Sequence, residues 1–530
     1  MAVFYHAEIH TMKDGDPVFF AMEVKDGQVA RLFSEEEFRE KFREPGKDMT
    51  DLGGRHVYPC LIDPHVHLLY TIAVMAAGFS ACRITEHGVE PRTLSEVGEK
   101  IQRFCASQKP GAVVAVNNYI RAAMAECRMP SREELDLWGG GRPVVLYNID
   151  GHSTSLSTAM LEKIGIDPAG HSGVLTGEEN ERAQGKITDV VSASVSLSVL
   201  AKGIACFENY CAEHGICMVG ALEGNGDSER DPATRLIAFL ARHFDTEVRL
   251  YLQYQDLRRV EPYTRWMHHR RVGGCGDWEM DGSVGSHSAA FDVPYPGKDA
   301  PSPCYYSEED ISRLIRDADR KGYQISSHAI GETAIRRLEN ALSETAPGRL
   351  HRIEHCEFTD DETFQKISEG RFAVVVQPGY SYIDKRYLHT YEEALPGEIL
   401  RRMKLRSYLR NGVILAGSSD SPVQDMDPFL QMAGMTSFYV EEESISAREA
   451  LLCYTRNAAL ALEEEASYGT LEPGKTASFF TADRDFAALS TEEILSFLPA
   501  ETYYKGKKYQ KKSGTVPELL TMLLRPAKKI

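Results

Sequence analysis

Two histidines separated by one residue give the strongest chemical signal in this chain. His65 and His67 end the segment Pro-Cys-Leu-Ile-Asp-Pro-His-Val-His (59–67), whose composition is typical of a strand. Side chains alternate along a strand, so the two imidazoles point the same way and Val66 points the opposite way. Two imidazoles on one face can bind a single metal ion such as zinc. Taken alone the pair is a weak signal that favours two ordinary histidines near a strand end, so other residues must decide the interpretation.

Three further candidate ligands each end another expected strand. They are His328, His355 and Asp420. The C-terminal ends of the strands of a parallel barrel meet at one mouth, so these side chains and the His-x-His pair would converge there. Sets of imidazole and carboxylate groups bind divalent ions. We therefore predict a site for a divalent metal ion.

A repeated unit positions these residues. It consists of an amphipathic helix, a turn that contains glycine, an apolar strand and a polar residue at the strand end. In the clearest copy Ser307 caps a helix, Gly322 ends it, and a strand follows over residues 323–328. Other copies end at Glu223 and Gln377. Repeated helix–strand units indicate an α/β fold, and chemically able residues at the strand ends are typical of a (β/α)8 TIM barrel.

The barrel accounts for only part of the chain. Both chain ends are rich in β-forming residues and turn signals, among them Asp14-Gly15 and the run Glu472-Pro473-Gly474-Lys475. We predict a small β-sandwich domain from residues 1–58 and 465–530, a barrel from residues 59–70 and 200–464, and an inserted cap region over residues 71–199. The expected cap contains an amphipathic helix and, after a strand, the motif Asp150-Gly151-His152.

The composition of the 530 residues excludes several classes of partner. The chain has 42% hydrophobic residues, and its 60 basic and 78 acidic side chains give a formal net charge of -18. This charge repels nucleic acid and anionic lipid, so we expect neither as a partner. The first residues contain no signal-peptide pattern, and the eleven cysteines include no C-x-x-C pair. A cytoplasmic protein with reduced thiols is therefore expected.

Together these motifs resemble a known family, the metal-dependent amidohydrolases, and specifically amidohydrolase family 3 with its N-substituted formamide deformylase-like members. The resemblance covers nearly the whole chain and is specific for the family, though not for a substrate. It is carried by His65-Val66-His67, Asp150-Gly151-His152-Ser153, Asp281-Gly282-Ser283, His328-Ala329-Ile330-Gly331, Ile353-Glu354-His355, Val376-Gln377-Pro378, Gly417-Ser418-Ser419-Asp420-Ser421-Pro422 and Gly469-Thr470-Leu471-Glu472-Pro473-Gly474-Lys475.

The resemblance implies a role for each candidate ligand. His65 and His67 would hold a first metal ion, and His328 and His355 a second. Asp420 would contact the first ion, accept a proton from the attacking water as general base, and pass this proton to the leaving nitrogen. Zinc or a similar ion would lower the pKa of the water.

Substrate contacts are expected from three further residues. His152 of the cap could stabilise the oxyanion, and Gln377 ends a strand at the same mouth. His287 stands where the family more often has an arginine, which predicts altered substrate contacts. Glu332, where relatives tend to have aspartate, could orient a histidine ligand.

The chain departs from the family at the fourth barrel strand. Relatives often place a bridging carboxylated lysine there, and the corresponding residue here is Asp277. Strand alternation would put Cys275, Asp277, Glu279 and Asp281 on one face. We favour Asp277 as the bridging ligand by alignment and keep Glu279 as the longer-reaching alternative. Two other possibilities are a thiolate ligand from Cys275 and a site with one tightly bound ion and no bridge.

The predicted activity is hydrolysis of the carbon–nitrogen bond of a small-molecule linear amide, of the N-acyl or N-formyl type. The alternative within enzymes is hydrolysis of a cyclic amide or deamination of a small heterocycle, because the same water and aspartate serve these reactions. An alternative of another class is a catalytically silent barrel that binds a small molecule, since the usual lysine is missing. The resemblance also implies a homodimer.

Overall fold

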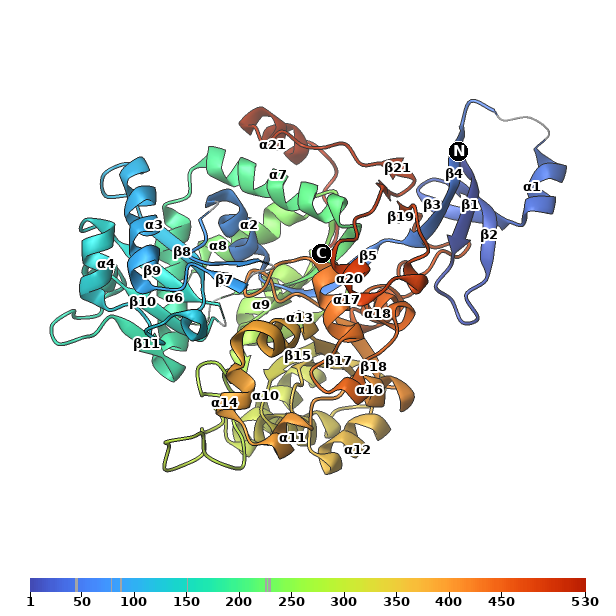
Figure 1. The fold of residues 1–530 in the computed structure, drawn as a ribbon. Coiled ribbons are helices and arrows are strands. Elements are labelled where there is room, and N and C mark those ends of the chain that lie inside the picture. The colour runs from blue at the N-terminus through green and yellow to red at the C-terminus, as the bar shows by residue number, and fades with distance from the viewer. Residues whose placement is uncertain (43–45, 78, 86–87, 150, 225, 227–229) are drawn as a thin grey trace.

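Eight parallel strands form a nearly closed barrel in the computed structural model, which describes residues 1–42, 46–77, 79–85, 88–149, 151–224, 226 and 230–530 (Figure 1). They are β5 (Leu61–Val66), β12 (Ile216–Glu223), β13 (Glu247–Leu252), β14 (Arg271–Glu279), β15 (Gln324–Ala329), β16 (His351–His355), β17 (Phe372–Val376) and β18 (Ile414–Gly417). They pair in the order β18-β17-β16-β15-β14-β13-β12-β5. A parallel bridge between Val66 and Ser421 brings the first and last strands together. The predicted barrel is confirmed.

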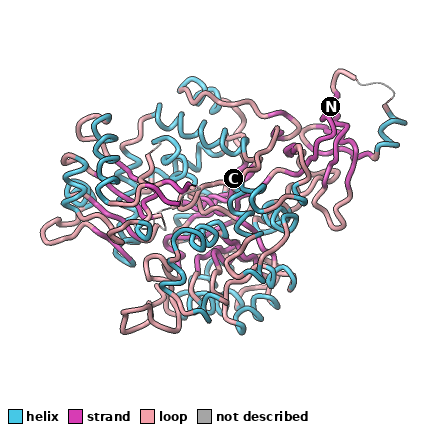
Figure 2. Tube along the Cα trace, in the orientation of Figure 1, coloured by secondary structure: helices cyan, strands magenta, loops and turns pink. Residues whose placement is uncertain are grey.

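Helices surround the barrel strands, as Figure 2 shows. They are α7 (Leu197–Glu213), α8 (Pro232–Ala241), α9 (Leu257–Thr264), α10 (Glu308–Arg320), α11 (Glu332–Ser343), α12 (Asp361–Glu369), α13 (Pro378–Ile383), α14 (Thr390–Ala394), α15 (Gly397–Leu400), α16 (Arg406–Arg410), α17 (Pro428–Thr436), α18 (Ala447–Tyr454) and α19 (Arg456–Ala461). Among the described helices none is both long and apolar enough to cross a bilayer alone. Arg182–Ala193 and Leu197–Glu213 meet the length and composition criteria only as a pair bent by 109°.

The unit from α10 to β15 shows why the local signals were sufficient. The Ser307 side chain accepts a hydrogen bond from the backbone N–H of Asp310 and so caps α10. Ile311 and Ile315 lie one helical turn apart and are fully buried. Gly322 has a φ of +77° just after the helix, a conformation that glycine adopts without a Cβ penalty. The chain then enters β15 as predicted.

The cap contains its own four-stranded sheet, in the order β11-β10-β9-β8. Its elements, with the preceding helix, are α2 (Leu68–Ala77), β6 (Arg83–Thr85), β7 (Gly88–Glu90), α3 (Leu94–Ser107), β8 (Val114–Tyr119), α4 (Arg132–Gly139), β9 (Val144–Asn148), β10 (Ser153–Leu156), α5 (Thr158–Ile164), β11 (Val174–Thr176) and α6 (Gly177–Ala193). Asp150 of the predicted motif lies outside the described residues, and His152 follows it directly. The cap sheet lies beside the barrel mouth in Figure 1.

Both chain ends contribute to one seven-stranded mixed sheet, in the order β21-β20-β19-β4-β1-β2-β3. Its strands are β1 (Ala2–His10), β2 (Val18–Lys25), β3 (Gln28–Phe33), β4 (Met49–Pro59), β19 (Phe479–Ala482), β20 (Glu501–Tyr504) and β21 (Lys507–Lys508). The helix α1 (Glu35–Lys41) packs on this sheet, whereas α20 (Thr491–Leu495) packs on α17 and α21 (Val516–Leu523) on α7. The prediction of a β domain shared by both ends is confirmed, while the residue bounds of the three parts stay a prediction. We call this sheet the end sheet.

Candidate metal centre

A cavity of about 520 Å³ opens at the C-terminal ends of the barrel strands. Barrel residues that line it include His67, Glu223, Cys275, Asp277, Glu279, His328, His355, Gln377 and Asp420, and cap residues include Tyr147, His152 and Arg182. Concave sites with a few convergent polar groups are where small molecules bind. The position agrees with the mouth at which the sequence places the candidate ligands.

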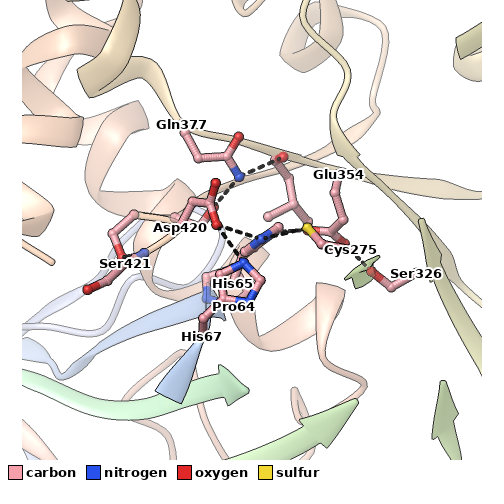
Figure 3. Close-up of polar contacts among 12 residues, drawn as sticks. Pro64, His65, His67, Cys275, Ser326, Glu354, Gln377, Asp420 and Ser421 are labelled. Carbon is pink, nitrogen blue, oxygen red and sulfur yellow. Dashed lines mark hydrogen bonds and ion pairs between the residues drawn. The ribbon is translucent and has the colours of Figure 1, made fainter. Parts of the chain in front are cut away.

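Asp420 brings the two histidines of the His-x-His pair together (Figure 3). Its Oδ1 atom lies 3.0 Å from His65 Nε2 and 3.1 Å from His67 Nε2. The backbone N–H of Asp420 also donates to the carbonyl of His65, at 3.0 Å. The first and last barrel strands are adjacent, so Asp420 meets histidines that lie near the other end of the barrel sequence.

Asp63 fixes the two segments that carry these residues. Its carboxylate accepts hydrogen bonds from the hydroxyl of Ser419 at 2.6 Å and from the backbone N–H groups of Ser419 and His65 at 3.2 and 3.3 Å. The carboxylate is buried, and burial raises its pKa to about 6. Asp63 therefore holds His65 and the residue before Asp420 in a fixed relation.

Glu354 orients the imidazole of His65. The two side chains are fully buried, and His65 Nδ1 lies 2.7 Å from Glu354 Oε2. Arg352 and Ser326 donate to the same carboxylate, from Nε at 2.8 Å and from Oγ at 2.6 Å. A carboxylate at Nδ1 places the ring proton there and leaves Nε2 as the ligand nitrogen. The sequence marks Glu354 only as part of the motif Ile353-Glu354-His355. Its contact with His65 gives it a positioning role.

His328 and His355 form the other half of the cluster. Their ring centroids are 4.3 Å apart, and His355 also packs 5.3 Å from the ring of His65. His328 Nε2 lies 3.3 Å from the carbonyl of Gly282, which leaves Nδ1 as the second nitrogen. Burial lowers the pKa of His328 well below its usual range and that of His355 to about 4. Both imidazoles are therefore neutral at neutral pH, the form that binds metals.

The charges of Asp420, His65 and His67 are tightly coupled. Burial by itself would raise the pKa of Asp420, but the imidazoles of His65 and His67 outweigh it and hold that pKa well below its usual range. Burial by itself would lower the pKa of His65, but Asp420 and Cys275 raise it well above its usual range. A proton or another cation at this point is therefore favoured by the surrounding groups.

Cys275 lies between the pair His65 and His67 and the pair His328 and His355. Its Sγ atom is 3.5 Å from His65 Nε2, and it shares one group of donor atoms with His65 and His67 and a second with His328 and His355. Atoms within each group lie no more than 4.8 Å apart. Burial raises the pKa of the thiol to about 12. A thiol that ligates a metal ion is deprotonated, because the ion stabilises the thiolate.

A bulge in β14 explains the central position of Cys275. Gly274 pairs with Ser327 of β15, but the next paired residue, Glu279, lies opposite the adjacent His328. Residues 275–278 therefore bulge between two adjacent residues of β15, which interrupts simple alternation along this strand. Of the four residues expected on one face, Cys275, Asp277 and Glu279 all line the cavity. Asp281 instead is fully buried and accepts hydrogen bonds from the backbone N–H groups of Ala290, Ile330 and Gly331.

Asp277 and Glu279 occupy other positions in the cavity wall. The Asp277 carboxylate packs over Gly226, where an added Cβ would come within 1.9 Å of Oδ2. Glu279 Oε1 accepts the backbone N–H of Gly276 at 2.9 Å, which closes the bulge. Among the described residues, neither carboxylate joins a group of three candidate donor atoms. Their proposed bridging role stays a prediction.

The three expected substrate contacts differ in position. His152 packs 5.5 Å from the ring of His328 and lines the cavity, and Gln377 lines it while donating to Ser418 Oγ at 2.8 Å. His287 instead stacks on Tyr295 at 4.8 Å and is absent from the described lining. The structure thus brings His152 and Gln377, but not His287, to the candidate centre.

The orienting role expected for Glu332 is not seen. Its Oε1 atom accepts the backbone N–H of Asp292 at 3.1 Å, and Oε2 forms an ion pair with Arg402. Glu332 begins α11 and therefore fixes a helix terminus rather than a histidine ring. The corresponding contact is made by Glu354, which lies next to His355 in the sequence and contacts His65 of β5 from the non-adjacent strand β16.

The donor set fits divalent metal ions. His355 Nε2 is buried and has no hydrogen-bond partner among the described residues, which is costly unless another group binds it. Imidazole nitrogen, carboxylate oxygen and thiolate sulfur are the ligand types of zinc and its neighbours. His65, His67 and Asp420 would hold one ion and His328 and His355 a second, with Cys275 between them.

Comparisons with known proteins agree with this geometry. Residues 48–508 match the sequence model of the amidohydrolase family. The chain is 23% identical to YtcJ of Bacillus subtilis (strain 168) over 97% of this chain and 100% of that protein. It is 26% identical to the N-substituted formamide deformylase of Arthrobacter pascens, over 96% and 98%. A crystal structure of an uncharacterized metal-dependent hydrolase from Pyrococcus horikoshii OT3 has the same fold, with a TM-score of 0.74, 19% identity and 93% and 99% coverage.

Proposed function

We propose that this chain, which belongs to the amidohydrolase family of metal-dependent hydrolases, cleaves the carbon–nitrogen bond of a linear amide. The observation that carries the proposal is the position of Asp420, whose Oδ1 atom lies within 3.1 Å of both His65 and His67 at the edge of the cavity. A base next to candidate metal ligands is the arrangement that activates water. Similarity to a relative named N-substituted formamide deformylase supports an N-formyl or N-acyl substrate.

Each residue has a defined part in this reaction. A divalent ion supplies Lewis acidity, which lowers the pKa of a bound water and polarises a carbonyl. Asp420 accepts the proton of the attacking water and delivers it to the leaving nitrogen. His152, in the cavity wall next to His328, donates a hydrogen bond to the carbonyl oxygen as negative charge develops. Gln377, which follows the C-terminal end of β17, contacts the substrate at the same mouth.

The basicity of Asp420 depends on its neighbours. The attraction that lowers its pKa comes from the imidazoles of His65 and His67 in their charged form. Imidazoles bind metal ions only when neutral, so in the loaded site the charge of the ion would replace this attraction and keep the carboxylate ionised. The ionised carboxylate is the form that can accept a proton.

Cys275 is part of the proposed metal centre. It is the one residue that shares a donor group with each pair of histidines among the described residues. We propose that its thiolate would hold metal together with each pair of histidines, in place of the lysine that relatives use. A soft sulfur ligand also favours zinc over magnesium or calcium. Charge-transfer absorption of the Co²⁺- or Cd²⁺-loaded protein reports a thiolate ligand directly, independently of hydrolysis.

A substrate panel tests the proposed reaction. The zinc-loaded protein is offered N-formylated amines, N-acyl amino acids, lactams and aminopurines, and release of amine, acid or ammonia is measured. Turnover of the first two classes, abolished by a chelator and restored by Zn²⁺, is expected. Turnover of lactams or aminopurines alone would establish the cyclic-amide or deaminase alternative. Tight binding of metal with no turnover of any class would favour the silent binding barrel.

Two further properties belong to the same proposal. A cytoplasmic location is proposed from the reduced state expected for the eleven cysteines. A homodimer is proposed from the family resemblance. Sedimentation of the purified chain would measure its oligomeric state, and a mass of one chain would contradict the dimer.

A further inference from the structure

A second group of candidate ligands lies far from the barrel mouth, on the end sheet. Glu8 and His10 of β1 and His56 of β4 place three donor atoms within 4.8 Å of one another. We propose that this group, here named the sheet triad, binds a transition metal ion such as Zn²⁺. The site is separate from the proposed catalytic centre and has no part in the hydrolysis derived above.

The pairing of the two strands brings the sheet triad together. β1 and β4 run parallel, and Glu8 lies directly opposite His56. His10 is two residues beyond Glu8 and therefore points to the same face of the sheet. Its ring stacks on Tyr58 at a centroid distance of 4.6 Å, which fixes the imidazole plane. The ligands thus come from a rigid sheet rather than from a loop, a placement that favours metal binding.

Two of the three interatomic distances fit tetrahedral coordination. His10 Nε2 and His56 Nδ1 are 3.1 Å apart, and Glu8 Oε2 is 3.5 Å from the same His56 nitrogen. With metal–ligand bonds of about 2.05 Å to nitrogen and about 2.1 Å to oxygen, these separations correspond to angles of about 98° and about 115° at a shared ion. Both are close to the tetrahedral value of about 109°. Three protein ligands leave a fourth position for water.

Hydrogen bonding satisfies the sheet triad less well than an ion would. His56 Nδ1 lies between His10 Nε2 and Glu8 Oε2, and one nitrogen carries at most one proton. If His56 Nδ1 donates its proton to Glu8, it cannot also accept a hydrogen bond from His10 Nε2. The close contact between the two ring nitrogens then has no hydrogen bond. A cation at the common point contacts all three atoms at once, because each offers a lone pair.

Acidic side chains around the sheet triad favour a cation. Asp16 Oδ2 lies 3.8 Å from His10 Nδ1, the nitrogen that faces away from His56. Asp485 accepts a hydrogen bond at 2.8 Å from the hydroxyl of Tyr58, the residue on whose ring His10 stacks. Carboxylates next to ligating imidazoles orient the rings and strengthen metal binding. Arg448 of α18 forms an ion pair with Asp16 at 3.6 Å, and this contact connects the end sheet to a barrel helix.

The donor types define the class of ion. Two imidazoles and one carboxylate favour Zn²⁺, Ni²⁺ or Cu²⁺, whereas Mg²⁺ and Ca²⁺ require oxygen ligands. A bound ion would join two strands that are 46 residues apart in the chain at positions 10 and 56. Binding to the folded state alone raises stability with the logarithm of ion concentration. The expected role is therefore structural.

Zinc stoichiometry of the full chain tests the proposal. The wild type and the variants His10→Asn and His56→Asn are equilibrated with Zn²⁺, separated from free ion and analysed for bound zinc. Each variant is expected to hold one ion fewer per chain than the wild type and to hydrolyse the amide at the wild-type rate. His6→Asn is the matched control: His6 lies on the same strand, is half-exposed and pairs with Asp51 at 2.8 Å, and its loss should not change the zinc content.

A third variant controls for misfolding of the two histidine variants. The side chains of His10 and His56 are only 12% and 16% exposed, whereas that of Glu8 is 60% exposed and can be replaced without disturbing the sheet. Glu8→Gln is expected to weaken binding of this one ion at least tenfold in a calorimetric titration. Wild-type zinc content in both histidine variants, or unchanged affinity in Glu8→Gln, would overturn the proposal. If the protein loses the ions at the barrel mouth but keeps the ion at the sheet triad, only the proposed catalytic centre is contradicted.

Discussion

Glutamine in place of Glu354 would disturb the way His65 is held. Glu354 is fully buried, and each carboxylate oxygen accepts two hydrogen bonds. Oε1 accepts from Ser326 Oγ at 2.6 Å and Arg352 Nε at 2.8 Å, and Oε2 accepts from His65 Nδ1 at 2.7 Å and Arg352 Nη2 at 3.0 Å. Glutamine has the same shape, but one of its two terminal groups is an NH₂ that only donates.

Neither orientation of the new amide satisfies these donors. An NH₂ at the Oε1 position faces Arg352 Nε, and an NH₂ at the Oε2 position faces both Arg352 Nη2 and His65 Nδ1. The second orientation would also move the His65 proton to Nε2, the nitrogen that faces Asp420. Removing one partner of a buried ion pair costs about 3–5 kcal/mol, because the remaining charge is uncompensated. Loss of the carboxylate behind a histidine ligand weakens metal binding about 10–100-fold.

Two measurements check this prediction. Denaturant unfolding of the metal-free chain should show that Glu354→Gln lowers the free energy of unfolding by about 3–5 kcal/mol. Competition with a chromophoric chelator should show zinc affinity reduced about 10–100-fold. Ser326→Ala is the matched control, since it removes one bond to Oε1 and leaves the Arg352 and His65 contacts; its expected cost is about 1 kcal/mol with zinc affinity unchanged. Wild-type zinc affinity in Glu354→Gln would refute the reasoning.

Cys275→Ser should remove the thiolate absorption of the Co²⁺-loaded protein and weaken zinc binding at least tenfold, while Cys453→Ser, buried in α18, should do neither; absorption retained in Cys275→Ser would exclude sulfur ligation there. Asp420→Asn should lower kcat about 10²–10⁴-fold, because the amide cannot accept the water proton, and steady-state kinetics with the best panel substrate checks this. Glu247 gives a pH prediction: burial alone would raise its pKa, but Lys528, Lys505 and Arg249 lower it to about 2. Its folded pKa lies below the unfolded value of 4.5, so its stabilisation is complete above pH 4.5 and is lost as pH falls through 2. Glu247→Gln should therefore cost roughly 3 kcal/mol at pH 7, and this difference should shrink towards pH 2 in acid unfolding curves; a difference independent of pH would contradict the linkage.

Local signals were sufficient for the barrel and its mouth. Caps, glycine turns and apolar strands are encoded within about ten residues of one another, as in the unit that starts at Ser307 and turns at Gly322. Once parallel strands are recognised, their C-terminal ends must meet, and His65, His328 and Asp420 follow from topology alone.

The interior of the site depended on contacts that alternation could not predict. The bulge after Gly274 arises from how β14 pairs with β15, and it moves Cys275 to the centre and Asp277 to the wall beside Gly226. Glu354 contacts His65 across 289 positions of sequence, so its role required the closed barrel. The parallel pairing of β1 with β4, which creates the sheet triad, is similarly non-local.

Anomalous diffraction from crystals of the zinc-loaded protein tests the proposed metal centre most directly. Peaks at the zinc edge are expected within about 2.0–2.3 Å of the His65, His67 and Asp420 side chains and of His328 and His355, with Cys275 Sγ bonded to both ions. The same data would show a separate peak at the sheet triad. Absence of zinc from the barrel mouth, or ions bridged by Asp277 or Glu279 with Cys275 Sγ unbonded, would contradict the metal centre proposed for this hydrolase.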